Sequence, residues 1–159
     1  MRSPVKVRRA RLEDVAAIHA IASEYRTAAQ WPLSDYVQAL ENIAARRVML
    51  VAEIASEVVG FLVARMVDSE WELENIAVTM GRQRKGIGQI LMQVLIEVAK
   101  HNDAEAIHLE VRESNSDARV LYERCGFEVS GTRPNYYANP EENAVLYRFL
   151  CKSETLKNG

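Results

Sequence analysis

The chain has 159 residues, 48% of them hydrophobic and 26% charged, and both the length and the composition are typical of one globular domain. Twenty lysines and arginines oppose twenty-two aspartates and glutamates, a near balance that excludes a general nucleic-acid-coating protein or a polybasic membrane protein. Two cysteines, three histidines without ligand spacing and no apolar run of bilayer length predict a soluble cytoplasmic protein without metal, disulfide framework or secretory signal.

Hydrophobic periodicity divides the N-terminal half into one strand, two helices and an extended meander. We predict a short strand at residues 5–9 and a helix at residues 12–26. A second helix is predicted at residues 34–45, with Ser34 as its N-cap. Segments rich in β-branched residues then predict three strands, at residues 48–54, 58–67 and 71–79.

The C-terminal half alternates helices and strands. A glycine-containing basic loop at residues 81–86 leads into a periodic helix, a strand follows at residues 106–112, and a short helix begins at Asn115 and ends at Gly126. The last two strands are predicted at residues 127–132 and 144–151, on either side of an irregular stretch, residues 133–143. This order predicts an α/β (α+β) fold, a mixed sheet with helices on both faces. We expect one domain, residues 1–151, and a loose tail, residues 152–159.

The loop Gln83-Arg-Lys-Gly-Ile-Gly88 is the most informative segment. Gly86 and Gly88 let the backbone approach a ligand, and the N–H groups at the start of the following helix favour an anion. With Arg84 and Lys85 they predict a pyrophosphate cradle, although a glycine-bearing turn with a solvated basic edge is the alternative. The spacing matches neither the Walker pattern nor the dinucleotide fingerprint.

Five motifs occur in one order along residues 6–150. They are Asn75-Ile-Ala-Val78, the loop at residues 83–88, Leu109-Glu-Val-Arg-x-Ser-Asn115, Leu121-Tyr-Glu123 with Gly126-Phe127, and Arg133-x-Asn-Tyr-Tyr137. Together they resemble the GCN5-related N-acetyltransferases (GNAT), and within them the ribosomal-protein-alanine N-acetyltransferases (RimI type). The resemblance implies the GNAT fold: a mixed, largely antiparallel central sheet of about seven strands with splayed central strands, flanked by four helices.

The resemblance also implies acetyl-coenzyme A as the donor and assigns residues to it. The backbone of Ile76, Ala77 and Val78 matches the positions that hold the pantetheine and the acetyl carbonyl, as an added strand would be held. The pyrophosphate matches a run of six residues: Arg84, Lys85, Gly86, Ile87, Gly88 and Gln89. Asn115 is an N-cap by its position, and by resemblance it also bonds the pantetheine.

Two residues match the family's proton-transfer groups. Glu110 corresponds to the general base that deprotonates the acceptor amine, and Tyr122 to the general acid that protonates the leaving thiolate. From the residues alone, Glu110 could equally be a solvated strand glutamate and Tyr122 a core tyrosine. His108 shares the predicted strand face with Glu110.

The expected acceptor is the N-terminal amine of a protein, by resemblance a small-subunit ribosomal protein. Six residues lie at positions that match the acceptor entrance: Trp31, Glu74, Arg133, Asn135, Tyr136 and Tyr137. Glu74 departs from the apolar residue usual there and could favour a more basic acceptor or act as a second base. The alternatives are acetylation of lysine side chains, polyamines or another small amine, and a non-catalytic acetyl-coenzyme A sensor. No nucleic-acid or membrane partner is expected, and the oligomeric state stays open between monomer and weak dimer.

Overall fold

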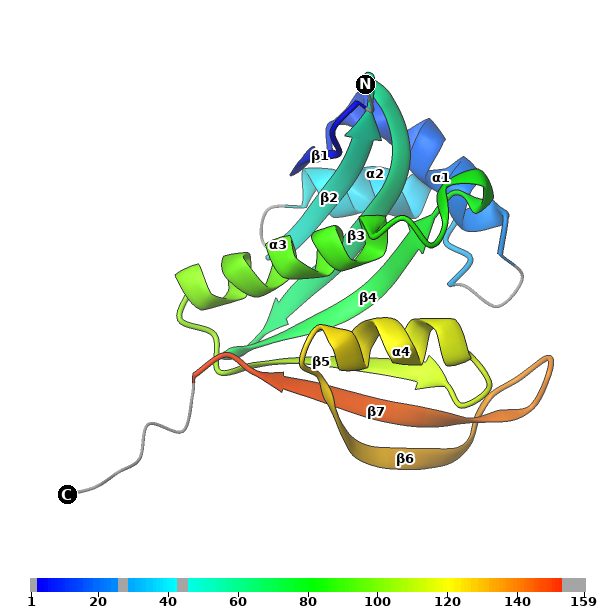
Figure 1. The fold of residues 1–159 in the computed structure, drawn as a ribbon, viewed down its shortest axis with the longest axis vertical. Helices are drawn as coiled ribbons and strands as arrows, with labels where there is room; N and C mark the ends of the chain where they lie inside the picture. Colours follow the sequence, from blue (N-terminus) through cyan, green and yellow to red (C-terminus); the bar gives the residue numbers. More distant parts are fainter. Residues whose placement is uncertain (1–2, 26–28, 43–45, 153–159) are drawn as a thin grey trace. The chain divides into compact units, whose positions relative to one another are not determined.

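The structure is a computed structural model that describes residues 3–25, 29–42 and 46–152 (Figure 1). Within these residues the helices and strands follow the predicted order. The strands are β1 (Lys6–Arg9), β2 (Arg47–Ile54), β3 (Glu57–Val67), β4 (Glu70–Val78), β5 (Ala106–Arg112), β6 (Glu128–Tyr137) and β7 (Glu142–Leu150). The helices are α1 (Val15–Ser23), α2 (Leu33–Glu41), α3 (Ile87–His101) and α4 (Ser116–Arg124), with 3-10 turns η1 (Leu12–Asp14) and η3 (Met80–Arg82). The predicted tail lies outside the described residues except for Lys152.

Seven strands of the described chain form one sheet, in the order β1-β2-β3-β4-β5-β7-β6. The pairs β1–β2, β2–β3, β5–β7 and β6–β7 are antiparallel, whereas β4 and β5 are parallel. The β4–β5 register covers three pairs and stops at Glu72 opposite His108, so the rest of each strand continues without that partner. The predicted mixed, largely antiparallel sheet with splayed central strands and four helices is confirmed.

The chain folds as two compact units, the first of which comprises residues 1–66 and 73–95. Its helices α1 and α2 pack on one face of β2, β3 and β4. The buried residues of that layer are Val15, Ile18, Ile21, Ala22, Tyr36, Ala39, Met49, Val51, Phe61, Val63 and Ala77. The opposite face of β3 carries Gly60, and a Cβ built there lies 3.5 Å from Cγ2 of Ile87, which places the start of α3 on that face. Both faces are therefore covered, and this explains why these strands are nearly continuous apolar runs.

The second unit, residues 67–72 and 96–159, contains β5, β6, β7 and α4. Alternate residues of β5 are buried, and the residues between them, His108, Glu110 and Arg112, are half-buried. Tyr147 of β7 lies opposite Leu109 and contacts the ring of Tyr122 on α4, with centroids 6.0 Å apart. Since opposed residues of a ladder share a face, α4 covers the apolar face of β5 (Figure 1). Glu110 consequently lies on the face that α4 leaves uncovered.

The start predicted for the second helix is wrong. Pro32, with an extended ψ of 151°, is the N-cap of α2, and Ser34 lies inside the first turn. The Pro32 carbonyl already accepts the Asp35 N–H at 2.9 Å, so the helix starts before a serine cap could act. Residues 26 and 43–45, at the ends predicted for the two helices, lie outside the described residues.

The irregular stretch predicted at residues 133–143 is also wrong in its first part, because β6 continues to Tyr137. Pro134 favoured a break, but β6 is an edge strand, where a missing N–H costs no ladder bond. The register of β6 with β7 shifts twice, between Val129 and Gly131 and between Arg133 and Tyr137, and Asn135 in the second of these stretches has a φ of 53°. Only residues 138–141 form the turn, and β7 begins two residues earlier than predicted.

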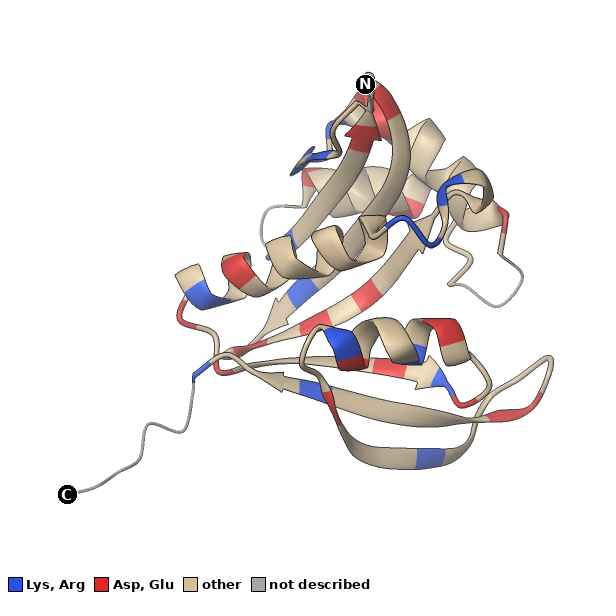
Figure 2. Cartoon of the chain, viewed as in Figure 1, with Lys and Arg blue, Asp and Glu red and all other residues tan. Residues whose placement is uncertain are grey.

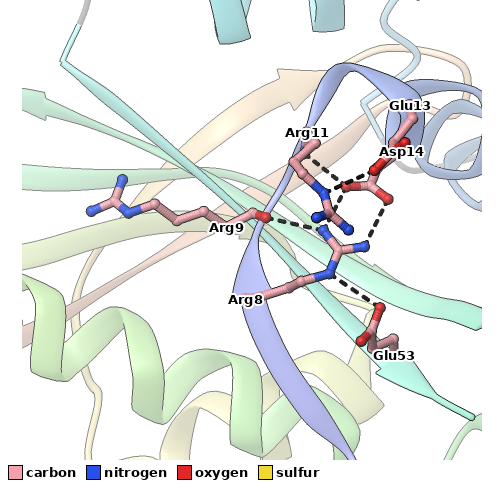
Figure 3. Close-up of polar contacts among 6 residues, drawn as sticks. All are labelled: Arg8, Arg9, Arg11, Glu13, Asp14 and Glu53. Atoms are coloured by element: carbon pink, nitrogen blue, oxygen red, sulfur yellow. Dashed lines mark hydrogen bonds and ion pairs between the residues drawn. The ribbon is translucent and has the colours of Figure 1, made fainter. Parts of the chain in front are cut away.

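Arg8 on β1 joins η1 to β2 through a network of ion pairs (Figure 3). Its Nη1 and Nη2 donate to both carboxylate oxygens of Asp14 at 2.7 and 2.9 Å, and its Nε donates to Glu53 at 3.1 Å. The Arg11 backbone N–H adds a bond of 2.7 Å to the buried Asp14. Chiefly the Arg8 hydrogen bonds, opposed by burial, hold the pKa of Asp14 below its ordinary value of 3.8.

Asp14→Asn should lower the free energy of unfolding at neutral pH by about 1–3 kcal/mol, since charge-assisted bonds are lost at a buried site. A carboxylate with a depressed pKa stabilises the fold above its unfolded pKa, and this contribution disappears as the pH falls below about 4. Urea titrations at pH 7 and pH 3 should therefore differ less for the variant than for the wild type. The exposed Glu13, which pairs with Arg11 at 2.9 Å, is the matched control. If Glu13→Gln costs as much as Asp14→Asn, burial of the network is not what stabilises it.

Candidate active site

The end of β4 presents backbone groups along one strand edge. The Thr79 N–H donates to the Val59 carbonyl of β3 at 2.8 Å. Backbone groups of successive strand residues point to opposite edges. The N–H and C=O groups of Ile76 and the N–H of Val78 therefore point away from β3, as an added extended ligand would require, whereas the Val78 carbonyl accepts a hydrogen bond from the Tyr25 hydroxyl. Ala77 between them is buried in the core.

Gly60 on β3 permits close packing behind this edge. A Cβ at this position would lie 3.2 Å from the Ala77 carbonyl oxygen and 3.4 Å from a Val78 methyl group. Any side chain would therefore push against the strand end that carries Ile76 and Val78. Local sequence gives no sign of this role of Gly60, because it depends on a neighbour seventeen residues away in the chain.

The loop after η3 turns sharply into α3. Arg84 has a φ of 61° and Gly86 a φ of 79°, and a Cβ built on Gly86 meets no atom within 4 Å. The backbone at Gly86 is thus open to a ligand, in agreement with the predicted cradle. Figure 2 shows basic residues along this loop, immediately before the helix N-terminus. Ile87 is buried, so its side chain anchors the helix in the core and only its backbone can face a ligand.

Glu74 is engaged by a side chain of its own unit. Arg47 donates to both Glu74 carboxylate oxygens, at 2.8 and 3.2 Å. The guanidinium carbon of Arg47 also lies 5.8 Å from the centroid of the Trp31 ring, which in turn packs against Tyr36 at 5.2 Å. Both carboxylate oxygens of Glu74 are thus engaged by arginine. This geometry does not favour Glu74 as a second base.

Two polar side chains of β6 contact the Glu110 carboxylate. The Arg133 Nη1 lies 3.5 Å from Glu110 Oε1, and the Tyr136 hydroxyl hydrogen-bonds the same carboxylate. This bond, followed by burial, raises the pKa of Tyr136. The structure therefore surrounds the predicted base with two of the predicted acceptor residues.

Tyr136 and Tyr137 form an aromatic pair beside Glu110. Their ring centroids are 5.0 Å apart and their planes are nearly perpendicular. Arg112 stacks on Tyr137 at 4.5 Å, while burial, followed by the charge of Glu110, raises the Tyr137 pKa to about 12. The fourth predicted residue, Asn135, bonds through its backbone N–H to Asn143 at 3.0 Å and so shapes the strand rather than the carboxylate.

Tyr122 projects from α4 into an aromatic cluster. Its ring centroid lies 6.1 Å from Phe127 and 6.0 Å from Tyr147. The side chain is buried, and burial raises its pKa well above the ordinary value. The hydroxyl consequently keeps its proton at neutral pH, as a proton donor must. The packing itself is that of a core tyrosine, and the role as general acid stays a prediction.

Asn115 is the N-cap of α4, as predicted. Its side-chain Oδ1 accepts the Ala118 N–H at 3.2 Å. The cap uses the side-chain oxygen of Asn115, and its amide nitrogen is a hydrogen-bond donor. A hydrogen bond from Asn115 to pantetheine stays a prediction. His108 is paired with Glu70 at 2.7 Å rather than with Glu110.

Tyr25 was missed as a site residue. Tyr25 lies within the helix predicted at residues 12–26, but α1 ends at Ser23. The Tyr25 hydroxyl hydrogen-bonds the Val78 carbonyl and the Gln83 side chain, both more than fifty residues away along the chain. No local pattern predicts such a contact.

In the described ranges, no group of three or more His, Cys, Asp or Glu side chains could hold a metal, and no helix has the length and hydropathy to cross a membrane.

The sequence model of the acetyltransferase (GNAT) family matches residues 15–127, which hold both the β4–α3 loop and the strand of Glu110. The chain belongs to the GNAT acetyltransferase family. Enzymes of this family use acetyl-coenzyme A as the acetyl donor. This assignment confirms the resemblance carried by the five motifs.

Several relatives of this GNAT acetyltransferase are named as ribosomal-protein-alanine N-acetyltransferases. A Bacillus subtilis protein named as a candidate ribosomal protein bS18-alanine N-acetyltransferase is 32% identical over 146 residues, covering 92% of this chain and 95% of that protein. The ribosomal protein bS18-alanine N-acetyltransferase of Haemophilus influenzae is 42% identical over 94 residues, covering 57% and 64%. The crystal structure of the ribosomal-protein-S18-alanine N-acetyltransferase of Escherichia coli matches with a TM-score of 0.83 at 25% identity, covering 96% and 99%.

Proposed function

We propose that this GNAT acetyltransferase transfers an acetyl group from acetyl-coenzyme A to the α-amino group of an N-terminal alanine, with ribosomal protein bS18 as the acceptor. The observation that carries the proposal is the cluster of Glu110, Arg133, Tyr136 and Tyr137, which places a carboxylate among aromatic and polar side chains suited to a peptide N-terminus. The names of the bacterial relatives supply the acceptor class.

The first unit supplies the groups for the donor. Acetyl-coenzyme A, when bound, provides a thioester-activated acetyl group. The strand edge at Ile76 and Val78 fits its amide-rich pantetheine arm, and the open backbone at Gly86 with the N-terminus of α3 fits its pyrophosphate. In this assignment the Val78 N–H stabilises the negative charge that develops on the acetyl oxygen.

The second unit supplies the proton transfers. A peptide α-amine has a pKa of about 7.7–8.0, so much of it is a non-nucleophilic ammonium at neutral pH. Glu110 accepts the ammonium proton, directly or through a water, and the free amine forms the new C–N bond. The C–S bond then breaks as the Tyr122 hydroxyl gives its proton to the departing sulfur, and the second proton, which the nitrogen loses on becoming an amide, passes through water and restores the Tyr122 hydroxyl. Transfer is direct, without an acyl-enzyme.

The acceptor contacts follow from the same cluster. Tyr136 is 47% exposed, so its ring is available to an incoming peptide, and Tyr137 supports it edge-on. Trp31 belongs to the loop that matches part of the acceptor entrance in the family. We infer that the enzyme acts in the cytoplasm, the compartment of ribosomes, as one catalytic domain of residues 1–151.

The test is the site of acetylation. The protein is incubated with acetyl-coenzyme A and, separately, an alanine-initiated bS18 peptide, the same peptide with a blocked N-terminus and internal lysines, and spermidine. We expect one acetyl group on the α-amine of the first peptide and background rates with the other two, measured by tandem mass spectrometry. Acetylation of lysine side chains or of spermidine in preference to the α-amine would overturn the proposed acceptor.

A further inference from the structure

Tyr25 connects the two ends of a short segment, residues 78–83. At one end its hydroxyl bonds the Val78 carbonyl on β4, and at the other it bonds the Gln83 side-chain amide. A carbonyl oxygen only accepts, so the tyrosine proton must go to Val78. The phenolic oxygen is then left to accept from Gln83 Nε2. The hydroxyl therefore satisfies one group at each end at the same time.

The tyrosine is itself held in place by its backbone. Its N–H donates to the Ala22 carbonyl at 3.2 Å, and its carbonyl accepts from Gln30 Nε2 at 2.5 Å. The ring packs against the core layer of α1 and α2, and burial raises the pKa of the phenol, so the proton stays on at neutral pH. A fixed ring with a protonated hydroxyl can hold the Val78 carbonyl and the Gln83 side chain at a fixed separation.

The two ends that Tyr25 joins have different tasks in the proposed function. Val78 belongs to the edge assigned to the thioester and pantetheine, whereas Gln83 begins the loop assigned to the pyrophosphate. Between them lies η3, a single turn closed by the Arg82 N–H to the Thr79 carbonyl at 2.9 Å. One turn cannot define a distance rigidly on its own, because it contains so few hydrogen bonds.

We propose that Tyr25 is a positioning residue that sets the spacing between the thioester-binding strand end and the pyrophosphate-binding loop. It touches neither ligand end in this assignment and acts through Val78 and Gln83. This inference rests on the proposed donor site, and it predicts an effect only on ligands that span both ends.

Tyr25→Phe removes the hydroxyl and keeps the packed ring. Binding is measured by calorimetry with coenzyme A, which spans both ends, and with 3′-phosphoadenosine 5′-diphosphate, which keeps the pyrophosphate but lacks the pantetheine. We expect the Kd of coenzyme A to rise about tenfold, the effect of losing one or two neutral hydrogen bonds, and the Kd of the fragment to change less than about twofold. Equal weakening of both ligands, or no weakening of either, would overturn the proposal.

Two further variants separate positioning from general damage. Gln83→Met removes only the second bond of Tyr25, and in a double-mutant cycle with Tyr25→Phe its effect on coenzyme A binding should be non-additive. Thr79→Val removes the neighbouring bond to Glu24, of 2.9 Å, and leaves Tyr25 intact. It should bind both ligands within about twofold of the wild type, as expected for an exposed bond. Additive effects of Tyr25→Phe and Gln83→Met on coenzyme A binding would contradict the positioning role of Tyr25. Failure of the wild type to bind coenzyme A would instead contradict the donor site itself.

Discussion

Glu110→Gln should lower kcat/KM for the peptide acceptor by about 10²- to 10⁴-fold, the usual contribution of a positioned general base. Glutamine keeps the size of the side chain and can still bond Tyr136, but it cannot take a proton from the ammonium. The deficit should grow as the pH falls below about 8, because less of the amine is then free. Steady-state rates between pH 6 and pH 9, with the bS18 peptide as acceptor, measure both effects.

A matched control is Glu105, an exposed glutamate that lies just before β5. Its side chain is far along the strand from residue 110, so Glu105→Gln should keep wild-type kinetics and thermal stability. A rate for Glu110→Gln within about threefold of this control would remove Glu110 from the mechanism. Loss of rate together with a large fall in melting temperature would identify a structural role instead, which the half-buried position of Glu110 does not favour.

Tyr122→Phe should lower kcat by about 10²-fold, the lower end of general-acid effects. The KM for acetyl-coenzyme A should stay within about twofold. The substitution keeps the ring between Phe127 and Tyr147 and removes only the hydroxyl. Without that proton donor the tetrahedral intermediate more often breaks its new C–N bond and returns to the thioester, so chemistry slows while donor binding persists. Single-turnover rates, measured beside the equilibrium Kd for acetyl-coenzyme A, separate the two quantities.

Tyr147→Phe is the companion measurement in the same aromatic cluster. The Tyr147 hydroxyl donates to Glu123 at 2.9 Å and accepts from Arg119 at 3.0 Å, which makes it a structural hydroxyl. Its loss should lower the free energy of unfolding by about 0.5–1.5 kcal/mol and leave kcat unchanged. If Tyr147→Phe slowed turnover as much as Tyr122→Phe, the rate effect would come from the packing of α4 and not from proton transfer.

Local patterns predicted most of the fold because they reflect local physics. The period-two burial of β5, from Ala106 to Arg112, and the αL glycine at position 126 both depend on residues that are neighbours in the chain. The predictions were wrong at positions where residues outside the local pattern determine the structure. Pro134 looks like a strand breaker until β6 is known to be an edge, and Ser34 looks like a cap until Pro32 starts the helix first.

For the site, motif spacing predicted the residues but not their partners. The pairing of Glu74 with Arg47 and the ring of contacts around Glu110 join residues more than twenty positions apart. Charge and spacing along the chain carry no signal for such pairs. Tyr25 shows the same limit most clearly, because its place at the end of a predicted helix gives no sign that its hydroxyl bonds the Val78 carbonyl and the Gln83 side chain.

Both residues that contact Glu110 from β6 sit on a strand whose side chains are nearly all exposed. A change at Arg133 or Tyr136 therefore alters the charge beside the carboxylate without opening a hole in the hydrophobic interior. In the proposed function, substitutions along β6 therefore change the contacts to the acceptor peptide at little cost in stability. The same freedom makes β6 the place at which to begin engineering acceptor choice.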